Sequence, residues 1–216
     1  MGRLICFLLF LLAALQSAQA QFQWGINAGP NVANRGGASS QANRPLFTTQ
    51  FAVFARDPLS DRVCLEPSLG YQGKGVKFRN VSTLDDLGNQ VGTGDECNLF
   101  NYLQFTIPFQ WRVNANEDCQ LYTGAGVYAA YLLSARSRLR DFHGSEQVDA
   151  GPVAIPVDRL RRVDGGLFLS VSALIRERWE IAIASSTGLA NSGIRNSTFG
   201  NVKNQSLGIT LGYLFR

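Results

Sequence analysis

The sequence predicts an all-β fold, a single eight-stranded antiparallel up-and-down transmembrane β-barrel. Three observations lead to this prediction: eight segments alternate apolar and polar residues, the links between them are alternately short and long, and an export signal precedes them. After Gln21, no stretch approaches the about 18 apolar residues of a spanning helix, so membrane residence requires strands.

The chain begins with the features of a secretory signal. A basic residue, Arg3, precedes the apolar run Leu4–Leu15, and the small residues Ala18 and Ala20 follow it. Signal peptidase recognises this order, and the apolar run is too short to cross a bilayer as a mature helix. We therefore expect a signal peptide at residues 1–20, cleavage near Ala20, and one barrel domain at residues 21–216.

Two-residue alternation marks the strands. It is clearest over Tyr102–Val113, where Leu103, Phe105 and Ile107 alternate with Gln104 and Thr106. Seven more segments follow the rule, at residues 22–29, 47–54, 62–71, 121–131, 163–175, 206–215 and from 179 onward. Eight is an allowed even number of strands for a membrane barrel.

The links give the predicted orientation. Short links at residues 57–61, 114–118 and 177–178 alternate with long ones that begin after strand one and near residues 73, 134 and 190. Outer-membrane barrels have minimal periplasmic turns and longer outside loops. Both termini are therefore expected in the periplasm, and the protein in the bacterial outer membrane.

The two faces of the strands differ in side-chain size. Large apolar side chains gather on one face, whereas glycine, serine and alanine dominate the other, as suits lipid and a narrow lumen. A secreted lipocalin-like carrier is the alternative, with its apolar face inside. At the ends bordered by short turns or the N-terminus, five aromatic residues predict a periplasmic girdle: Trp24, Trp111, Trp179, Tyr213 and Phe215.

Charged residues on the polar face predict a lumen network. Buried charges must be paired or hydrated, so a salt-bridged plug near the periplasmic end is expected, with a transport gate as the alternative. The members of the predicted network are Arg62, Glu66, Arg112, Asp164, Arg176 and Glu180.

A basic stripe is expected at the outer mouth. Arg136, Arg138 and Arg140 recur at every second position where strand five runs past Leu133. Guanidinium groups suit charge-assisted contacts to lipopolysaccharide phosphates or to an acidic partner. A merely solvated loop is the alternative.

No residue pattern points to chemistry. The only histidine, His143, lies in an expected loop beside Asp141 and Ser145, where a hydrolase triad would lack rigid support. Outside the signal, the three cysteines Cys64, Cys97 and Cys119 match no metal spacing, and we expect no disulfide between them. The net charge of +4 comes without a nucleic-acid-binding motif. We expect no enzyme activity, no cofactor and no nucleic acid.

Local motifs then resemble the PorT-like outer-membrane β-barrel proteins of Gram-negative bacteria. The resemblance covers Phe22–Phe215, although the family usually ends on an aromatic residue and Arg216 follows here. It implies fold and location, since most members have no assigned activity. The motifs that carry it, in order, are Leu65–Gly75, Tyr102–Pro108, Gly124–Leu133, Asp164–Gly166, Thr187–Leu189 and Leu211–Phe215.

These observations predict a non-enzymatic outer-membrane protein, a structural, assembly or secretion accessory acting through its loops or lumen. The expected partners are outer-membrane lipid and lipopolysaccharide, the barrel-assembly machinery, and a secretion-system or cell-surface protein. A small-solute channel is the principal alternative.

Overall fold

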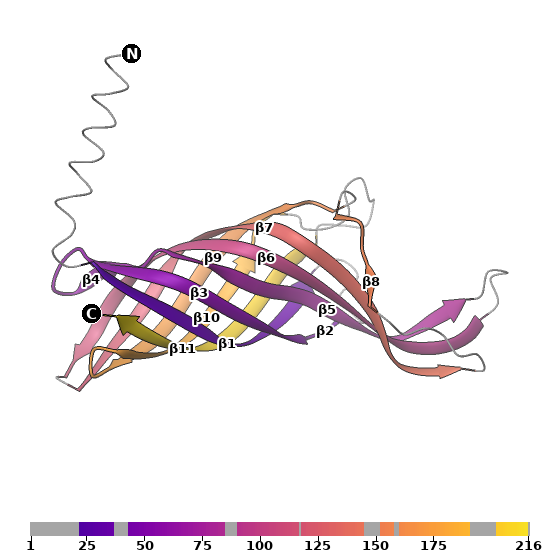
Figure 1. Ribbon diagram of the computed structural model, residues 1–216, viewed down its shortest axis with the longest axis horizontal. Helices are drawn as coiled ribbons and strands as arrows, with labels where there is room; N and C mark the ends of the chain where they lie inside the picture. Colours follow the sequence, from indigo (N-terminus) through magenta and orange to yellow (C-terminus); the bar gives the residue numbers. More distant parts are fainter. Residues whose placement is uncertain are drawn as a thin grey trace, which may run out of the picture.

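A computed structural model shows one long barrel with a sheet projecting from one end (Figure 1). It describes residues 22–36, 43–84, 90–116, 118–144, 152–157, 160–190 and 202–215. The predicted signal peptide at residues 1–20 lies outside these residues. No helix within these ranges is long and apolar enough to cross a membrane.

Eight antiparallel strands close into a ring of hydrogen bonds, in which each pairs with the next along the chain and the last pairs with the first. This confirms the predicted up-and-down barrel. Its strands are β1 (Gln23–Gly36), β3 (Leu46–Pro58), β5 (Ser68–Leu84), β6 (Gln90–Ala115), β7 (Cys119–Gly144), β9 (Val163–Ile175), β10 (Trp179–Gly188) and β11 (Lys203–Phe215). Three short strands add to it: β2 (Asn43–Arg44) on β5, β4 (Val63–Leu65) between β3 and β6, and β8 (Val153–Ala154) on β7.

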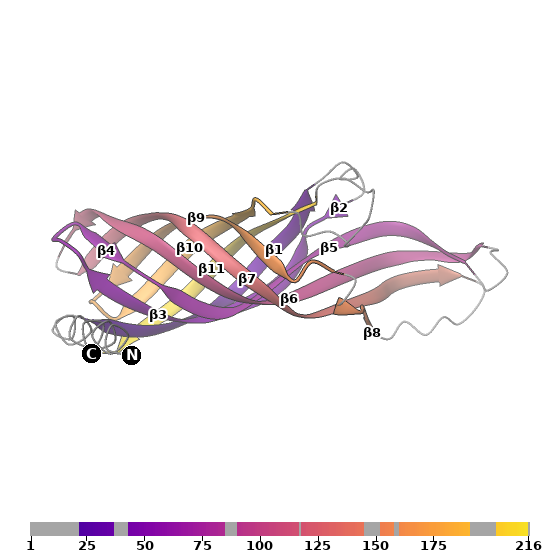
Figure 2. The same cartoon turned by 90° about the horizontal axis from the view of Figure 1, so that it is seen from above.

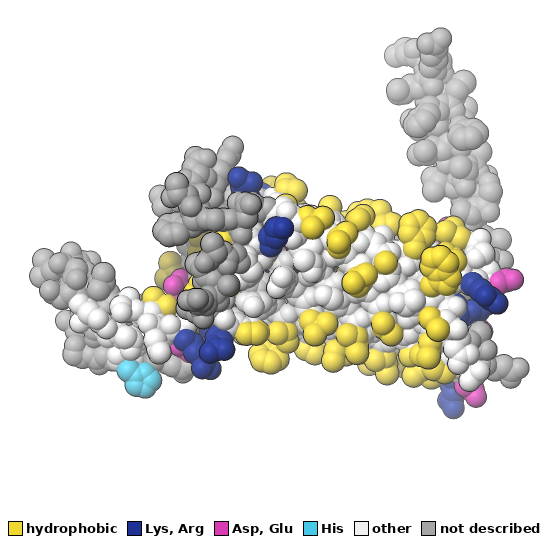
Figure 3. All heavy atoms as spheres, turned by 180° about the vertical axis from the view of Figure 1, so that it is seen from behind, with side chains coloured by type: hydrophobic (Ala, Val, Ile, Leu, Met, Phe, Trp, Pro, Cys, Tyr) yellow, Lys and Arg dark blue, Asp and Glu magenta, His cyan; other side chains and the backbone are white. Residues whose placement is uncertain are grey.

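The large apolar side chains face outward. Val127 on β7 is 57% exposed and Leu169 on β9 is 60% exposed. Figure 3 shows such side chains as a band across the face in view, with Lys and Arg side chains at either end of the band. A soluble carrier would need these side chains inside, so the arrangement fits a barrel surrounded by lipid.

The lumen is narrow because strands approach each other closely at glycines. A Cβ at Gly166 would lie 2.1 Å from the carbonyl oxygen of Thr187, and one at Gly126 would lie 2.2 Å from that of Ile107. No side chain fits at such separations. Glycine is therefore required at these two positions of the inner face.

Beyond the barrel, β5, β6 and β7 continue together as a three-stranded sheet, hereafter the extension (Figures 1 and 2). The sequence predicted long loops from residues 73 and 134, and that prediction is wrong, since strand structure reaches Leu84 and Gly144. Apolar alternation reports contact with lipid. Where a strand leaves the bilayer, both of its faces turn polar, although the backbone pairing continues.

A β-bulge on β7 separates the barrel from the extension. Asn101 of β6 pairs with Ser134, but the next residue, Tyr102, pairs with Leu132, so β7 carries one extra residue. A shift of one residue moves side chains to the opposite face of a sheet. Leu132 before the bulge is buried, whereas Arg136 after it is exposed.

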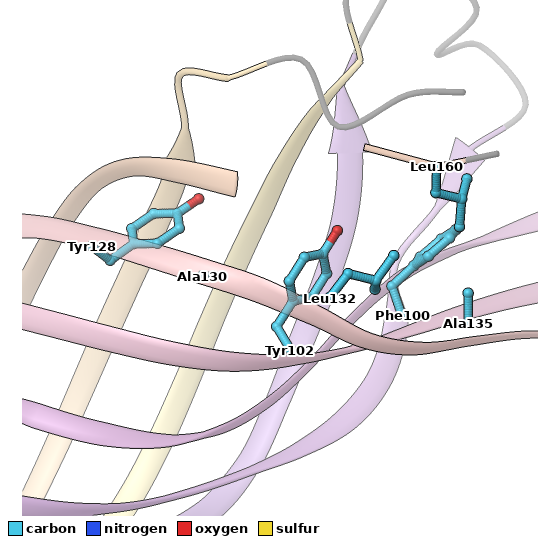
Figure 4. Close-up of a cluster of buried hydrophobic side chains, with 7 residues drawn as sticks. All are labelled: Phe100, Tyr102, Tyr128, Ala130, Leu132, Ala135 and Leu160. Atoms are coloured by element: carbon cyan, nitrogen blue, oxygen red, sulfur yellow. The ribbon is translucent and has the colours of Figure 1, made fainter. Parts of the chain in front are cut away.

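The connection between β7 and β9 packs against the inner face at this end of the barrel. Leu160 belongs to a buried apolar cluster with Phe100, Leu132 and Ala135 (Figure 4), and Ile155 packs against it. Two backbone hydrogen bonds hold the segment: Ile155 N–H donates to the carbonyl of Ala135 at 2.9 Å, and Leu132 N–H donates to that of Arg162 at 2.7 Å. The connection thus covers part of the barrel end from which the extension projects.

Candidate functional site

One set of buried charges occupies the lumen near the short turns. The guanidinium of Arg56 on β3 donates from Nε to Glu66 Oε2 at 2.8 Å and from Nη2 to Glu180 Oε1 at 2.8 Å. The three side chains are only 5%, 11% and 4% exposed. Gln110 donates a further hydrogen bond to Glu66 at 3.3 Å. We call these four residues the Arg56 cluster.

Local sequence explains how Glu66 reaches this position. Pro67 has no N–H to donate, so the strand ladder breaks between β4 and β5. Across the break, Glu66 N–H still donates to the carbonyl of Pro108 at 3.1 Å, and Ala55 N–H donates to that of Pro67 at 2.9 Å. The carboxylate is therefore held on the lumen side by backbone on both flanks.

A second set of charges lies at the other end of the lumen. Lys74 Nζ on β5 is 3.1 Å from Asp164 Oδ2 on β9, and both side chains are fully buried. The same carboxylate oxygen accepts hydrogen bonds from the Tyr128 hydroxyl at 3.2 Å and the Asn204 amide at 2.9 Å. The ammonium also lies 4.1 Å from the centre of the Tyr128 ring. We call these residues the Lys74 cluster.

The predicted single network is thus divided. Glu66 and Glu180 meet, but on either side of Arg56, which the sequence analysis did not include. Asp164 opens β9 after a long link, so it lies at the opposite end with Lys74, the second omitted partner. Placing all six charges at one end ignored that successive strands of an up-and-down barrel begin at opposite ends.

Three predicted members take no part in either cluster. Arg176 lies in the turn between β9 and β10 with a φ of 48°, and its side chain is exposed. Arg62 and Arg112 stand near the short turns, and within the described ranges their side chains make no hydrogen bond or ion pair. Arg56 and Lys74 continue the inward faces of their strands past the ends expected from alternation, which is the signal that would have found them.

A cavity of about 80 Å³ extends from the Arg56 cluster toward the Lys74 cluster. Amide side chains dominate one wall, among them Gln50, Gln72 and Gln104. Both ends of the lumen therefore contain paired charges, and the cavity between them is lined by polar and apolar side chains together.

The predicted basic stripe lies on the outward face of the extension. Arg136, Arg138 and Arg140 are exposed and stand opposite Leu99, Cys97 and Asp95 of β6 in the register. On the same sheet, Lys77 forms an ion pair with Asp95 at 2.7 Å, and its hydrogen bond lowers the pKa of that carboxyl. The stripe begins just after Leu133, an exposed apolar side chain of β7.

The predicted aromatic girdle lies at the short-turn end. Trp179 and Tyr213 stack edge to face at 5.0 Å, and Tyr213 and Phe215 do so at 5.3 Å. Trp24 pairs with Phe215 across β1 and β11. Trp111, 58% exposed, pairs with Val63 beside the turn that precedes β4.

The residues considered for chemistry are dispersed. His143 lies on β7 in the extension and is exposed, in a strand rather than the expected loop. Cys64 and Cys97 are buried at opposite ends of the molecule, Cys119 opens β7, and all three thiols are free. Across the part of the chain that the structure describes, no group of three His, Cys, Asp or Glu side chains is placed to hold a metal ion.

Comparison with solved structures finds small barrels of similar extent. Ail of Yersinia pestis shares 12% identity over 90% of this chain and 99% of its own, with a TM-score of 0.44. Neisserial surface protein A shares 10% identity over 89% of this chain and 97% of its own, with a TM-score of 0.45. OprG of Pseudomonas aeruginosa shares 13% identity over 90% of this chain and 96% of its own, with a TM-score of 0.41. No curated protein matches the sequence.

A family model described as the outer membrane protein beta-barrel domain matches residues 16–193, most of the chain. This match does not separate the PorT-like members from others. It agrees with the closed ring of eight strands and with the outward apolar band. The chain therefore belongs to the outer membrane protein beta-barrel domain family and is a small barrel of the bacterial outer membrane.

Proposed function

We propose that this barrel is a non-enzymatic accessory of the PorT-like type, which acts by contact through its extension. One contrast carries the proposal: buried ion pairs occupy the lumen at two levels, whereas three strands leave the barrel and expose an arginine stripe. Residues 1–20 direct export, and the short turns and both termini face the periplasm. The extension then projects outside the cell, within reach of assembly, secretion or cell-surface proteins.

The stripe is proposed to bind lipopolysaccharide phosphates. Arg136 follows directly on the apolar band, three residues after the exposed Leu133, so it lies at the level where phosphate groups border the hydrocarbon. Two residues advance a strand by about 6.6 Å, which spaces Arg138 and Arg140 outward along the same face. Guanidinium groups bind phosphate oxygens through two parallel hydrogen bonds.

Replacing all three stripe arginines with alanine should weaken binding of the refolded barrel to lipopolysaccharide. Each exposed charge pair contributes about 0.2–1 kcal/mol, so three pairs lead us to expect a loss of roughly 3- to 150-fold that shrinks as salt is raised. Binding of fluorescent lipopolysaccharide to barrels in nanodiscs measures it. The control replaces Arg62, Arg176 and Arg178, which removes the same charge at the short-turn end; an equal loss there would contradict the proposal. Wild-type-like lipopolysaccharide binding combined with loss of a crosslinked protein in cells would assign the stripe to an acidic partner instead.

Contact by the extension is tested in intact cells. A photo-crosslinker at Arg138 should trap a discrete neighbour, whereas one at Val171, which faces lipid on β9, should not. Identical adducts from both positions, or none from either, would remove the case for an accessory that works through its extension.

A small-solute channel is the second candidate, favoured by the cavity inside the lumen and the amide side chains in its wall. The ion pairs on both sides of that cavity lead us to expect no steady conductance from the wild-type barrel in planar bilayers. Reproducible unitary currents from purified, folded protein would favour the channel over the accessory.

A further inference from the structure

A second cavity opens at the short-turn end, beyond the Arg56 cluster. Its volume is about 410 Å³, within the range of about 300–1,000 Å³ that small-molecule sites occupy. We propose that it is a binding site for a carboxylate, carried by a small organic acid or by the C-terminus of a peptide. The proposal concerns binding alone and does not depend on the accessory role.

Three arginines from different strands and turns line the cavity. Arg56 belongs to its wall with a side chain only 5% exposed, and its charge is paired with Glu66 and Glu180. Arg112 at the end of β6 is half-buried, and Arg62 in the turn before β4 is exposed. Neither of the latter two uses its guanidinium for an ion pair in the described part of the chain, so both are left to bind a ligand.

Neutral groups in the same wall add a hydrogen-bonding surface. The Tyr122 hydroxyl donates to Gln120 Oε1 at 2.6 Å, which fixes the amide and leaves its nitrogen for a ligand oxygen. The Arg56 guanidinium lies 5.0 Å from the centre of the Tyr122 ring, which restrains both side chains. A site whose donors are fixed in advance binds with less loss of side-chain entropy.

Two acidic residues define which anions the site accepts. Asp61 and Glu177 also line the cavity, and both are exposed on turns. They oppose a second negative charge on the ligand, while Arg62 and Arg112 favour the first. A carboxylate matches the planar fork of a guanidinium, and Arg62 and Arg112 are the two lining guanidinium groups that such a ligand would meet.

The test uses the full barrel, refolded in nanodiscs and checked for folding by its heat-dependent gel mobility. The probes are acetyl-Ala-Ala with a free carboxylate, the same peptide as its C-terminal amide, and propionate. NMR titration should show saturable binding of the free peptide and none of the amide. Binding of propionate as well would mean that the carboxylate alone suffices, and binding of the peptide alone would identify a C-terminus; both outcomes support the site.

Variants locate the binding. Arg112→Gln and Arg62→Gln should each weaken it by about 10-fold or more, because a hydrogen bond to a charged group contributes about 1.5–3 kcal/mol. Arg178→Gln is the matched control, since Arg178 is exposed on a short turn but does not line the cavity. The proposal is overturned if the amide binds as well as the acid, if neither binds, or if the control variant weakens binding equally.

Discussion

Replacing Lys74 with methionine should destabilise the refolded barrel by about 3–5 kcal/mol, because it leaves the fully buried carboxylate of Asp164 without its cation. The hydrogen bonds from Tyr128 and Asn204 remain, but they do not neutralise the charge. Urea unfolding and refolding titrations in lipid vesicles at neutral pH measure the difference in free energy.

The double variant Lys74→Met/Asp164→Asn separates the ion pair from the packing around it. Removing both charges should recover much of the stability that the single variant loses, since no uncompensated buried charge remains. Lys203→Met is the control, because Lys203 is exposed on β11. If the single and double variants were equally unstable, the loss would come from packing rather than from an unpaired charge.

Arginine at Val127 should cost about 2–4 kcal/mol, since it places a charge in the middle of the lipid-facing band. Val127 is 57% exposed and pairs with Ile107 and Leu167, which lie midway between the aromatic girdle and the stripe. The same refolding titration applies.

A second outward-facing valine, at a different depth in the membrane, provides the comparison for this prediction. Val113 is also exposed, at 69%, but lies at the end of β6 near the short turns. Arginine there should cost only about 0–1 kcal/mol, as expected near an interface. Equal costs at the two positions would contradict the placement of the hydrocarbon around the barrel.

The sequence allowed prediction of those parts of the fold on which lipid acts. Where a strand has lipid on one face and a narrow lumen on the other, large and small side chains must alternate, as they do from Tyr102 to Val113. The alternating short and long links then predicted an up-and-down order of the strands, with no information on which strands pair. Both signals are local along the chain, which is why they sufficed for the ring of eight strands.

The sequence could not predict what depends on pairing beyond the bilayer. In the extension, apolar and polar residues no longer alternate, so the part of β7 beyond Leu133 was predicted to be a loop. Ion partners posed a similar problem. The partner of Asp164 is 90 residues away along the chain, and only the strand register brings Lys74 to it. The types of the inward residues indicated that buried charged side chains need ion partners, but they did not identify those partners.

The extra residue in the bulge at Leu133 reverses which face of β7 the following side chains occupy. Even-numbered residues from Tyr122 to Leu132 face the lumen, and even-numbered residues from Arg136 to Arg140 face away from it. Without the extra residue, the guanidinium groups would therefore turn toward the buried apolar cluster around Phe100 and Leu160, although the types of residue would be the same. The extra residue therefore lets β7 place its even-numbered side chains in the lumen within the barrel and on the outward face of the extension beyond it.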